Sequence, residues 1–191
     1  MRLFRFRNMA MVLMGMISFF SCQWETTATE KTSTNSDTTP VVASELVLVY
    51  GIDISKYQGD EVDFINKKEN SLSFVICKAT EGVTYTDPDF QHNWEMIAQK
   101  GLIRGAYHFY RCDDQPEAQS KNYLDKISDL QKTDLPPIID FEEGGIDKTQ
   151  SVEQIQMTLI TFLKEIENRT SRTPIIYTDV NTGNNFSPAE I

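Results

Sequence analysis

The stretch PPIIDFEEGG, residues 136–145, places three carboxyl groups directly after a short apolar run. The run has the composition of a buried β-strand, which normally excludes charge. Side chains at positions i and i+2 of a strand share one face, so Asp140 and Glu142 are expected to point the same way, while Phe141 and Glu143 point the other. Paired carboxyl groups suit acid/base chemistry on a glycosidic bond. The charge of one raises the pKa of the other, which can then donate a proton to the leaving oxygen.

The spacing of Asp140 and Glu142 leaves the mechanism open. Same-face neighbours on a strand lie roughly 6.5–7 Å apart at Cα, because the rise is about 3.3 Å per residue. This is nearer to the inverting separation of roughly 6.5–9.5 Å than to the retaining separation near 5 Å, but side chains can lean. A D-x-E pair also has a second use. The Glu acts as the acid while the Asp orients the 2-acetamido group of a sugar, whose oxygen attacks the anomeric carbon.

The elements that must position these acids alternate along the chain from Leu46. Strands are predicted for five apolar, β-branched runs: 46–55, 72–82, 102–111, 135–143 and 173–179. Helices are predicted between them: around 61–69, 89–100, 116–130 and 151–168. The last helix begins with Ser151 and Gln154 in a capping-box pattern. Strands that alternate with helices over short links predict an α/β fold with a parallel sheet.

Parallel sheets carry their chemistry at the carboxyl ends of the strands. Polar side chains gather at the predicted ends of the first four runs: Asp53, then Lys78 and Glu81, then Tyr107 and His108, then Asp140 and Glu142. A single acid at a strand end is usually a helix N-cap or a loop residue. Four successive strands that all end in polar groups predict a functional edge of the sheet.

Four segments in order carry a resemblance to a known family: GIDIS (51–55) with Gln58, FVICKATEG (74–82) running into YTDPDF (85–90), GAYHFYR (105–111) and PIIDFEE (137–143). Over about residues 48–180 the chain resembles glycoside hydrolase family 25, the bacterial and phage-type lysozymes of muramidase specificity. The resemblance implies a (β/α) barrel of the TIM-like type that needs no cofactor. It also implies cleavage of the β-1,4 bond between N-acetylmuramic acid and N-acetylglucosamine in the glycan strands of peptidoglycan.

The resemblance assigns catalytic roles to three acids. Glu142 would be the general acid, and Asp140 and Asp53 its carboxylate partners, which activate water or manage the acetamido group. His108 is expected to be a packing or hydrogen-bonding residue. Two alternatives remain: an inactive or glycan-binding relative, and a hydrolase of another N-acetylhexosamine polymer.

Three further residues would contact the substrate. By the same resemblance Tyr107 would lie in the sugar groove. Lys78 and Glu81 would lie at the rim as substrate-binding residues with less defined roles.

Other site types find little support. His92 and His108 lie on separate predicted elements, and no Cys/His spacing typical of a metal site occurs. Cys77 and Cys112 lie on neighbouring runs, where two buried thiols are favoured over a disulfide. The formal net charge is −10, without a basic patch, which argues against nucleic acid as a partner.

The N-terminal 45 residues predict export. Residues 1–22 contain three arginines, an apolar run and a small residue before Cys22, the pattern of a signal peptide with a lipobox-like end. Lipidation of Cys22 would anchor the protein to a membrane of the cell envelope, and the alternative is a secreted or periplasmic protein. Residues 23–45 are rich in Ser and Thr and predict a disordered tether. The catalytic domain would comprise residues 46–191.

The predicted barrel is short of strands. A (β/α) barrel needs eight, and only five runs occur in residues 46–191. The last residues, SPAEI (187–191), have the pattern of a helix start. The sequence therefore predicts a domain that is incomplete at its C-terminus. We expect the isolated chain to be poorly soluble and to show little or no lysis; a monomer that melts cooperatively and lyses walls at ordinary rates would contradict this.

Overall fold

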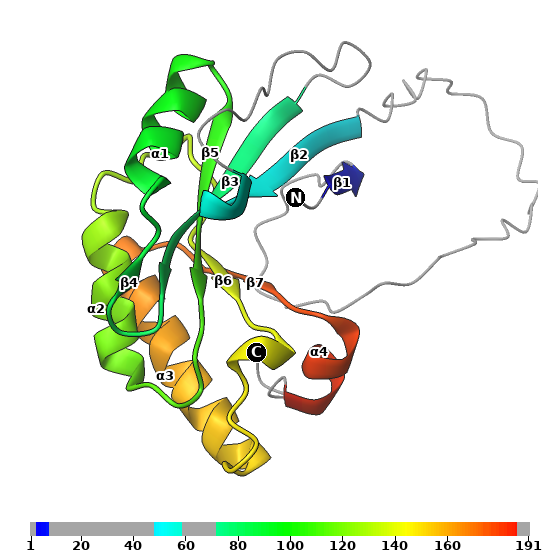
Figure 1. Ribbon diagram of the computed structural model, residues 1–191, viewed down its shortest axis with the longest axis vertical. Helices are drawn as coiled ribbons and strands as arrows, with labels where there is room; N and C mark the ends of the chain where they lie inside the picture. Colours follow the sequence, from blue (N-terminus) through cyan, green and yellow to red (C-terminus); the bar gives the residue numbers. More distant parts are fainter. Residues whose placement is uncertain (1–2, 8–47, 59–71, 187–191) are drawn as a thin grey trace, which may run out of the picture.

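The computed structural model describes residues 3–7, 48–58 and 72–186 (Figure 1). Its sheet has the strand order β1-β2-β3-β5-β6-β7, and the five strands from β2 to β7 run parallel. The main strands are β1 (Leu3–Arg7), β2 (Leu48–Ile54), β3 (Leu72–Glu81), β5 (Ile103–Phe109), β6 (Ile138–Asp140) and β7 (Ile175–Tyr177). The α/β class and the five predicted strands are confirmed. Together the parallel strands form a curled half-barrel sheet.

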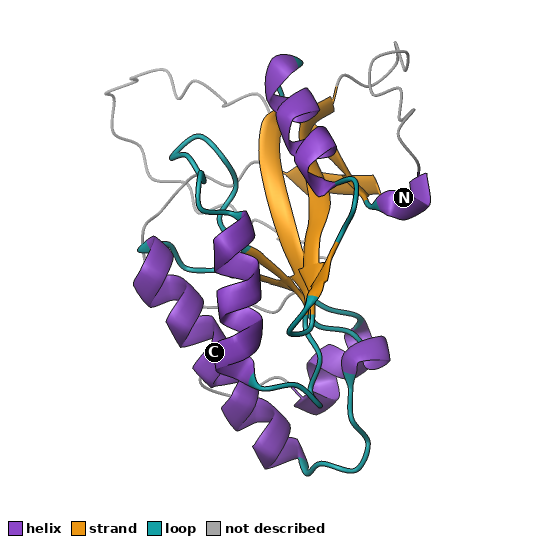
Figure 2. Ribbon diagram, turned by 60° about the vertical axis from the view of Figure 1, so that its left-hand side comes forward, coloured by secondary structure: helices purple, strands orange, loops and turns teal. Residues whose placement is uncertain are grey.

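Three long helices cover one face of this sheet (Figure 2). They are α1 (Phe90–Gln99), α2 (Pro116–Lys126) and α3 (Val152–Thr170), and a short α4 (Val180–Phe186) follows β7. The predicted capping box of α3 is confirmed: the Ser151 amide donates to Gln154 Oε1 at 2.9 Å, and the Gln154 amide donates to Ser151 Oγ at 3.3 Å. The predicted helices around 61–69 and at 187–191 lie outside the described residues.

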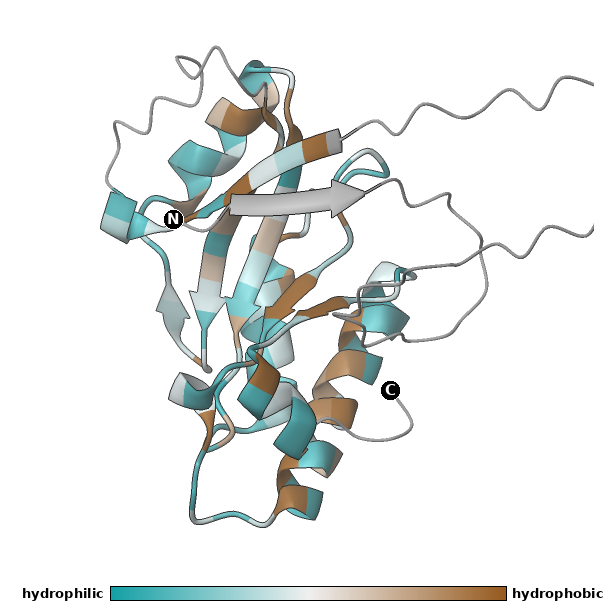
Figure 3. Cartoon of the chain, turned by 90° about the vertical axis from the view of Figure 1, so that its right-hand side faces the viewer, coloured by the Kyte–Doolittle hydropathy of each residue, from teal (hydrophilic) through white to brown (hydrophobic). Residues whose placement is uncertain are grey.

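The two faces of the sheet carry separate apolar clusters. The outer cluster lies between the sheet and the helices. On the sheet side it includes the strand residues Ile52, Ile54, Val75, Cys77, Ala79 and Ile139, and Phe141 directly after β6. Its helical side comes from residues such as Trp94, Tyr123 and Phe162, and Figure 3 shows apolar and polar residues alternating along α3. The inner cluster is smaller and consists of Phe74, Ile76 and Ile138, with Tyr107 and Tyr177 packed against it. The inner face is therefore apolar only part of the way along the strands.

Gly51 lets the inner cluster close over β2. A Cβ atom at this position would lie 2.1 Å from the Phe74 ring, which belongs to the neighbouring strand. Any side chain here would displace Phe74. The glycine of the GIDIS motif therefore serves the packing of the inner face.

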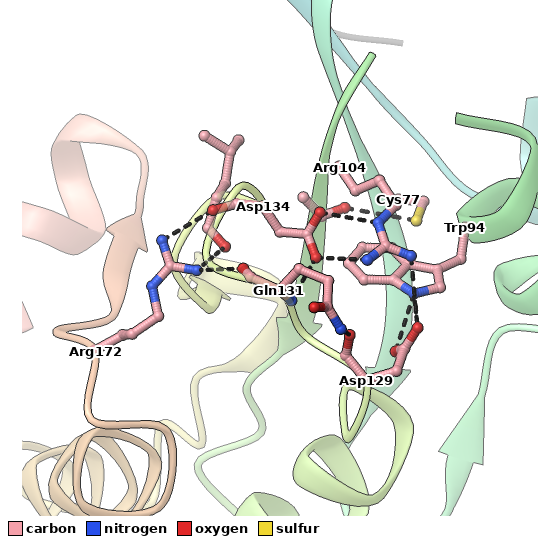
Figure 4. A network of polar contacts seen from close by, with 9 residues as sticks. Cys77, Trp94, Arg104, Asp129, Gln131, Asp134 and Arg172 are labelled. Carbon is pink, nitrogen blue, oxygen red and sulfur yellow. Dashed lines mark hydrogen bonds and ion pairs between the residues drawn. The ribbon is translucent and has the colours of Figure 1, made fainter. Parts of the chain in front are cut away.

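A polar network fastens the amino end of the sheet (Figure 4). Arg104 on β5 donates from Nε and Nη2 to the two carboxylate oxygens of Asp134 at 2.9 and 2.6 Å, and its guanidinium lies 4.0 Å from the Trp94 ring centroid. Trp94 Nε1 donates to Asp129 at 2.9 Å, and Arg172 Nη2 donates to the Asp134 carbonyl at 2.8 Å. The network joins α1, β5 and the segments that precede β6 and β7, far from the carboxyl ends of the strands.

The strand β1 was not predicted. It pairs antiparallel with β2, with Leu3 opposite Ile52 and Arg7 opposite Leu48. Its residues belong to the predicted signal peptide, and a cleaved signal would not contribute this strand to the mature protein. Cys22 and the tether at 23–45 lie outside the described residues, so export and lipidation remain predictions. None of the helices within the described residues is both long and apolar enough to cross a bilayer.

Candidate active site

The three proposed catalytic acids lie at the carboxyl ends of β2 and β6. Asp53 is the penultimate residue of β2, Asp140 is the last residue of β6, and Glu142 follows two positions later. The strand neighbours of Asp53 and Asp140 belong to the outer cluster, so both acids face the inner side of the sheet. Asp140 is only 9% exposed, whereas Asp53 and Glu142 are half-buried.

Asp53 and Asp140 share the inner face of a curled sheet, on strands that are not neighbours. Strands β3 and β5 lie between β2 and β6, so the path along the sheet is three strand spacings, or about 14 Å. A curled sheet shortens the direct line between side chains on its concave face. The inner face is thus a shared surface on which acids from both strands can address one ligand.

The loop after β6 holds Glu142 in place. The Phe141 amide donates to the Tyr177 carbonyl at 2.9 Å, and the Gly145 amide donates to the Glu142 carbonyl at 2.9 Å. A Cβ on Gly145 would lie 2.1 Å from the Tyr110 carbonyl oxygen, so this turn packs directly on the backbone after β5. These contacts fix the backbone on both sides of Glu142.

Glu143 departs from the predicted strand alternation. The strand ends at Asp140, and Glu143 begins the short 3-10 helix η2 (Glu143–Gly145). Phe141 is fully buried in the outer cluster, as predicted, but Glu143 is exposed and pairs with Lys148 at 3.0 Å. The prediction that Glu143 shares the face of Phe141 was therefore wrong, because strand geometry ends before it.

A β-bulge places Lys78 and Glu81 together. Residues three apart on a regular strand face opposite sides, but the register of β3 shifts between Lys78 and Thr80, and both Ala79 and Thr80 are fully buried. Glu81 thereby returns to the side of Lys78, and Lys78 Nζ lies 2.6 Å from Glu81 Oε2. Both predicted rim residues are at the carboxyl end of β3, as an ion pair.

Tyr107 lies deeper on the inner face. It pairs with Lys78 on β3 and with Ile138 on β6, and it packs against the inner cluster. Asp140 is two residues further along β6 than Ile138, so Tyr107 lies below the level of the acids. Its half-buried ring forms part of the floor beneath them.

His108 lies in the outer core, away from the acids. Its Nδ1 lies 2.7 Å from Thr80 Oγ1 and its Nε2 lies 3.2 Å from Gln119 Oε1, and the ring stacks on Phe162. Burial lowers the pKa of His108 to about 4. The expectation of a packing and hydrogen-bonding residue is confirmed.

This histidine predicts a loss of stability in acid. Between about pH 6.5 and pH 4 the imidazole of His108 binds a proton in the unfolded chain but stays neutral in the folded chain. The free energy of unfolding therefore falls as the pH falls through this range. The expected loss is at most about 1.4 kcal/mol per pH unit within this window. Urea unfolding at pH 7 and pH 5 measures it. His108→Gln should reduce the pH dependence, and His92→Gln, at an exposed position on α1, should not; equal slopes in all three proteins would contradict the prediction.

Cys77 and Cys112 are both free and buried, as expected. Cys77 Sγ donates to the Gly105 carbonyl at 3.5 Å. Burial raises the pKa of both thiols, that of Cys112 to about 11, so neither is a ready nucleophile. Within the described residues no three His, Cys, Asp or Glu side chains gather closely enough to hold a metal ion.

The structure adds three rim residues without a predicted role: Lys56, Tyr57 and Tyr85. Lys56 and Tyr57 begin η1 (Lys56–Gln58), directly after β2, and Tyr85 lies in β4 (Tyr85–Thr86), which pairs antiparallel with the end of β3. The Lys56 amide donates to Oδ2 of the buried Asp87 at 3.1 Å, which joins the two segments. The signal available in the sequence was that Lys56 and Tyr57 directly follow the GIDIS motif and that Tyr85 opens the YTDPDF motif.

Comparison with known proteins agrees with this geometry. The family model "Glycosyl hydrolases family 25" matches residues 52–189. Lysozyme M1 of Streptomyces globisporus is 32% identical over 136 residues, which cover 68% of this chain and 46% of that protein. The N,O-diacetylmuramidase of Chalaropsis sp is 33% identical over 142 residues, 69% of this chain and 66% of that protein. The YegX protein of Escherichia coli strain CFT073 is 34% identical, over 68% of this chain and 47% of its own length.

Solved structures show the same fold. The family 25 glycosyl hydrolase of Bacillus anthracis superposes with a TM-score of 0.65 at 27% identity, over 71% of this chain and 63% of that one. The muramidase of Acremonium alcalophilum gives a TM-score of 0.65 at 30% identity, over 72% and 68% of the two chains. The chain spans about half the length of several curated relatives it matches. By family model, sequence and fold, the chain belongs to glycosyl hydrolase family 25.

Proposed function

We propose that this chain is a peptidoglycan hydrolase, a muramidase that cleaves the β-1,4 bond between N-acetylmuramic acid and N-acetylglucosamine. The observation that carries the proposal is the position of Asp140 at the carboxyl end of β6, two residues before Glu142 and on the same inner face as Asp53. Relatives named lysozyme and N,O-diacetylmuramidase support this substrate class.

The solvent exposure of the three acids suggests a different catalytic role for each. Glu142 is half-buried at the sheet edge and would donate a proton to the leaving oxygen. Asp140 is nearly buried and fixed at the end of a strand, which suits it to hold the acetamido group in position. Asp53 lies across the inner face and would assist from the other side, by activating water or by stabilising the positive charge that develops on the sugar ring.

We also propose that the five parallel strands are part of a TIM-like (β/α) barrel. Their order in the sheet follows the chain, each joins its neighbour in parallel, and the helices lie on the outer side. Polar residues at the carboxyl ends of the strands are where such barrels carry their active sites. The likeness to solved family 25 structures supports the same reading.

The substrate is tested by comparing two polymers. The 191-residue chain is incubated with purified peptidoglycan and with chitin oligomers, and new reducing ends are measured, since this readout detects slow turnover. Release from peptidoglycan without release from chitin is expected. Release from chitin alone would favour a hydrolase of another N-acetylhexosamine polymer, and binding to peptidoglycan without any release would favour an inactive, glycan-binding relative.

We further propose that Cys22 is lipidated and anchors the protein to a membrane of the cell envelope. The support is the arginine-rich start, the apolar run and the cysteine that follows a small residue. Cys22→Ser is expected to move the protein from the membrane fraction into the soluble envelope or the medium. Fractionation with detergent extraction measures this shift. Unchanged partition into detergent would contradict the lipid anchor and favour plain secretion or another attachment.

A further inference from the structure

Lys56 is held between two aromatic rings at the rim of the proposed active site. Its ammonium lies 5.2 Å from the ring centroids of both Tyr57 and Tyr85. Its backbone is fixed by the hydrogen bond to the buried Asp87 carboxylate. The contact with Tyr85 is the main cause of a raised pKa for Lys56, so this side chain stays charged at physiological pH. The cation is therefore charged and positioned before any ligand arrives.

Lys56 also differs from the other cations of this rim. Those cations are each bound to a carboxylate: Lys78 to Glu81 at 2.6 Å, Arg111 to Asp113 at 3.3 Å and Lys148 to Glu143 at 3.0 Å. Among the described residues Lys56 contacts aromatic rings and no carboxylate within ion-pair distance. Its positive charge thus remains available to an anionic ligand.

The cluster leads directly to the acids. Lys78 Nζ lies 5.4 Å from the centroid of the same Tyr85 ring and 5.1 Å from that of the Phe109 ring. Phe109 in turn pairs with Asp140 on β6. Tyr57 is 80% exposed, so one face of an aromatic ring beside the cation is open to solvent. A ligand bound at the acids can extend along this row of rings to reach Lys56.

We propose that Lys56, flanked by Tyr57 and Tyr85, binds a carboxylate of the substrate and makes the site selective for anionic cell-wall glycan over neutral glycan. This inference rests on the proposed function. Peptidoglycan carries carboxylates on its stem peptides and, where a stem is absent, on the lactyl group of muramic acid. A protein of net charge −10 with three acids in its site would repel such a polymer. One cation placed at the rim offsets this repulsion locally and selects for charge.

The test measures binding by co-sedimentation with insoluble glycans, on ice and within minutes. Four glycans are compared: intact peptidoglycan, peptidoglycan stripped of its stems by an amidase, peptidoglycan whose carboxyl groups are converted to amides, and chitin. Lys56→Met is expected to weaken binding to intact peptidoglycan about fivefold, the effect of one exposed ion pair, and to leave binding to amidated wall and chitin unchanged. Lys56→Arg should restore binding. The control is Lys121→Met, on the exposed face of α2 and paired with Asp125, which should bind as the parent does.

The stripped glycan identifies the carboxylate. An effect of Lys56→Met that disappears on stripped glycan assigns the stem-peptide carboxylates. An effect that grows on stripped glycan assigns the lactyl carboxylate, because the amidase frees this group when it removes the stem. The inference is overturned if Lys56→Met binds intact peptidoglycan as tightly as the parent, or loses affinity for chitin to the same extent. If the parent chain cleaves peptidoglycan and Lys56→Met binds it as tightly as the parent does, this subsite alone is refuted. If the parent chain never cleaves peptidoglycan but Lys56→Met still binds it more weakly, the proposed function is refuted and the subsite is retained.

Discussion

Glu142→Gln is expected to lower the rate of peptidoglycan cleavage by about a thousandfold while binding to the wall is retained. Glutamine keeps the size and hydrogen-bonding shape of the side chain but cannot donate the proton that the leaving oxygen needs, and general acid catalysis contributes about a hundred- to ten-thousandfold. The backbone around Glu142 is held by the Phe141 and Gly145 hydrogen bonds, so the substitution should not disturb the loop. Release of reducing ends and co-sedimentation with peptidoglycan measure the two properties.

The neighbouring residue supplies the matched control. Glu143 is exposed and pairs with Lys148 on the surface of η2, so Glu143→Gln changes the same chemical group one position away without touching the inner face. Its cleavage rate should match that of the parent chain. If Glu142→Gln cleaves peptidoglycan as fast as Glu143→Gln, then Glu142 is not the general acid.

Asp134→Ala is expected to lower the free energy of unfolding by about 3 kcal/mol. Asp134 and Arg104 are nearly buried, with 5% and 12% of their side chains exposed, and removal of the carboxylate leaves the guanidinium without its two-pronged partner. The Gln131 amide loses its acceptor as well, at 2.8 Å from Asp134 Oδ2. Urea unfolding followed by circular dichroism measures the change.

Two further variants separate this buried pair from ion pairs in general. Asp125→Ala breaks the exposed pair with Lys121 and should cost no more than about 0.5 kcal/mol. The double change Arg104→Met with Asp134→Leu removes both charges together and should recover much of the stability lost in Asp134→Ala. A loss for Asp134→Ala no larger than that for Asp125→Ala would show that the network of Figure 4 does not stabilise the amino end of the sheet.

The arrangement separates stability from chemistry along the strands. The Arg104 network lies where the parallel strands begin, and the acids and the Lys56 cluster lie where they end. The outer cluster packs the strands against the helices on the opposite face of the sheet from the acids. This division lets the rim carry several charges without placing them in the core.

The sequence by itself determined the five parallel strands, the three long helices and much of the chemistry. The strand runs, the parallel α/β class and the capping box at Ser151 depend on local periodicity and local hydrogen bonds, which the chain order contains. The burial of Phe141 and the inward direction of Asp140 follow from the alternation of a single strand. The packing and hydrogen-bonding role of His108 was expected from the family-like motif that contains it.

Only the tertiary structure decided how the rim is assembled. The pairing of Lys78 with Glu81 needs a bulge, which forms where β3 meets a neighbouring strand. Lys56 meets Tyr85 because its backbone binds Asp87, 31 residues away in the sequence. Asp53 and Asp140 share an inner face only through the strand order of a curled sheet, in which two strands lie between them. Each of these features requires contacts between segments that are distant in the chain. The spacing of residues within one segment does not predict such contacts.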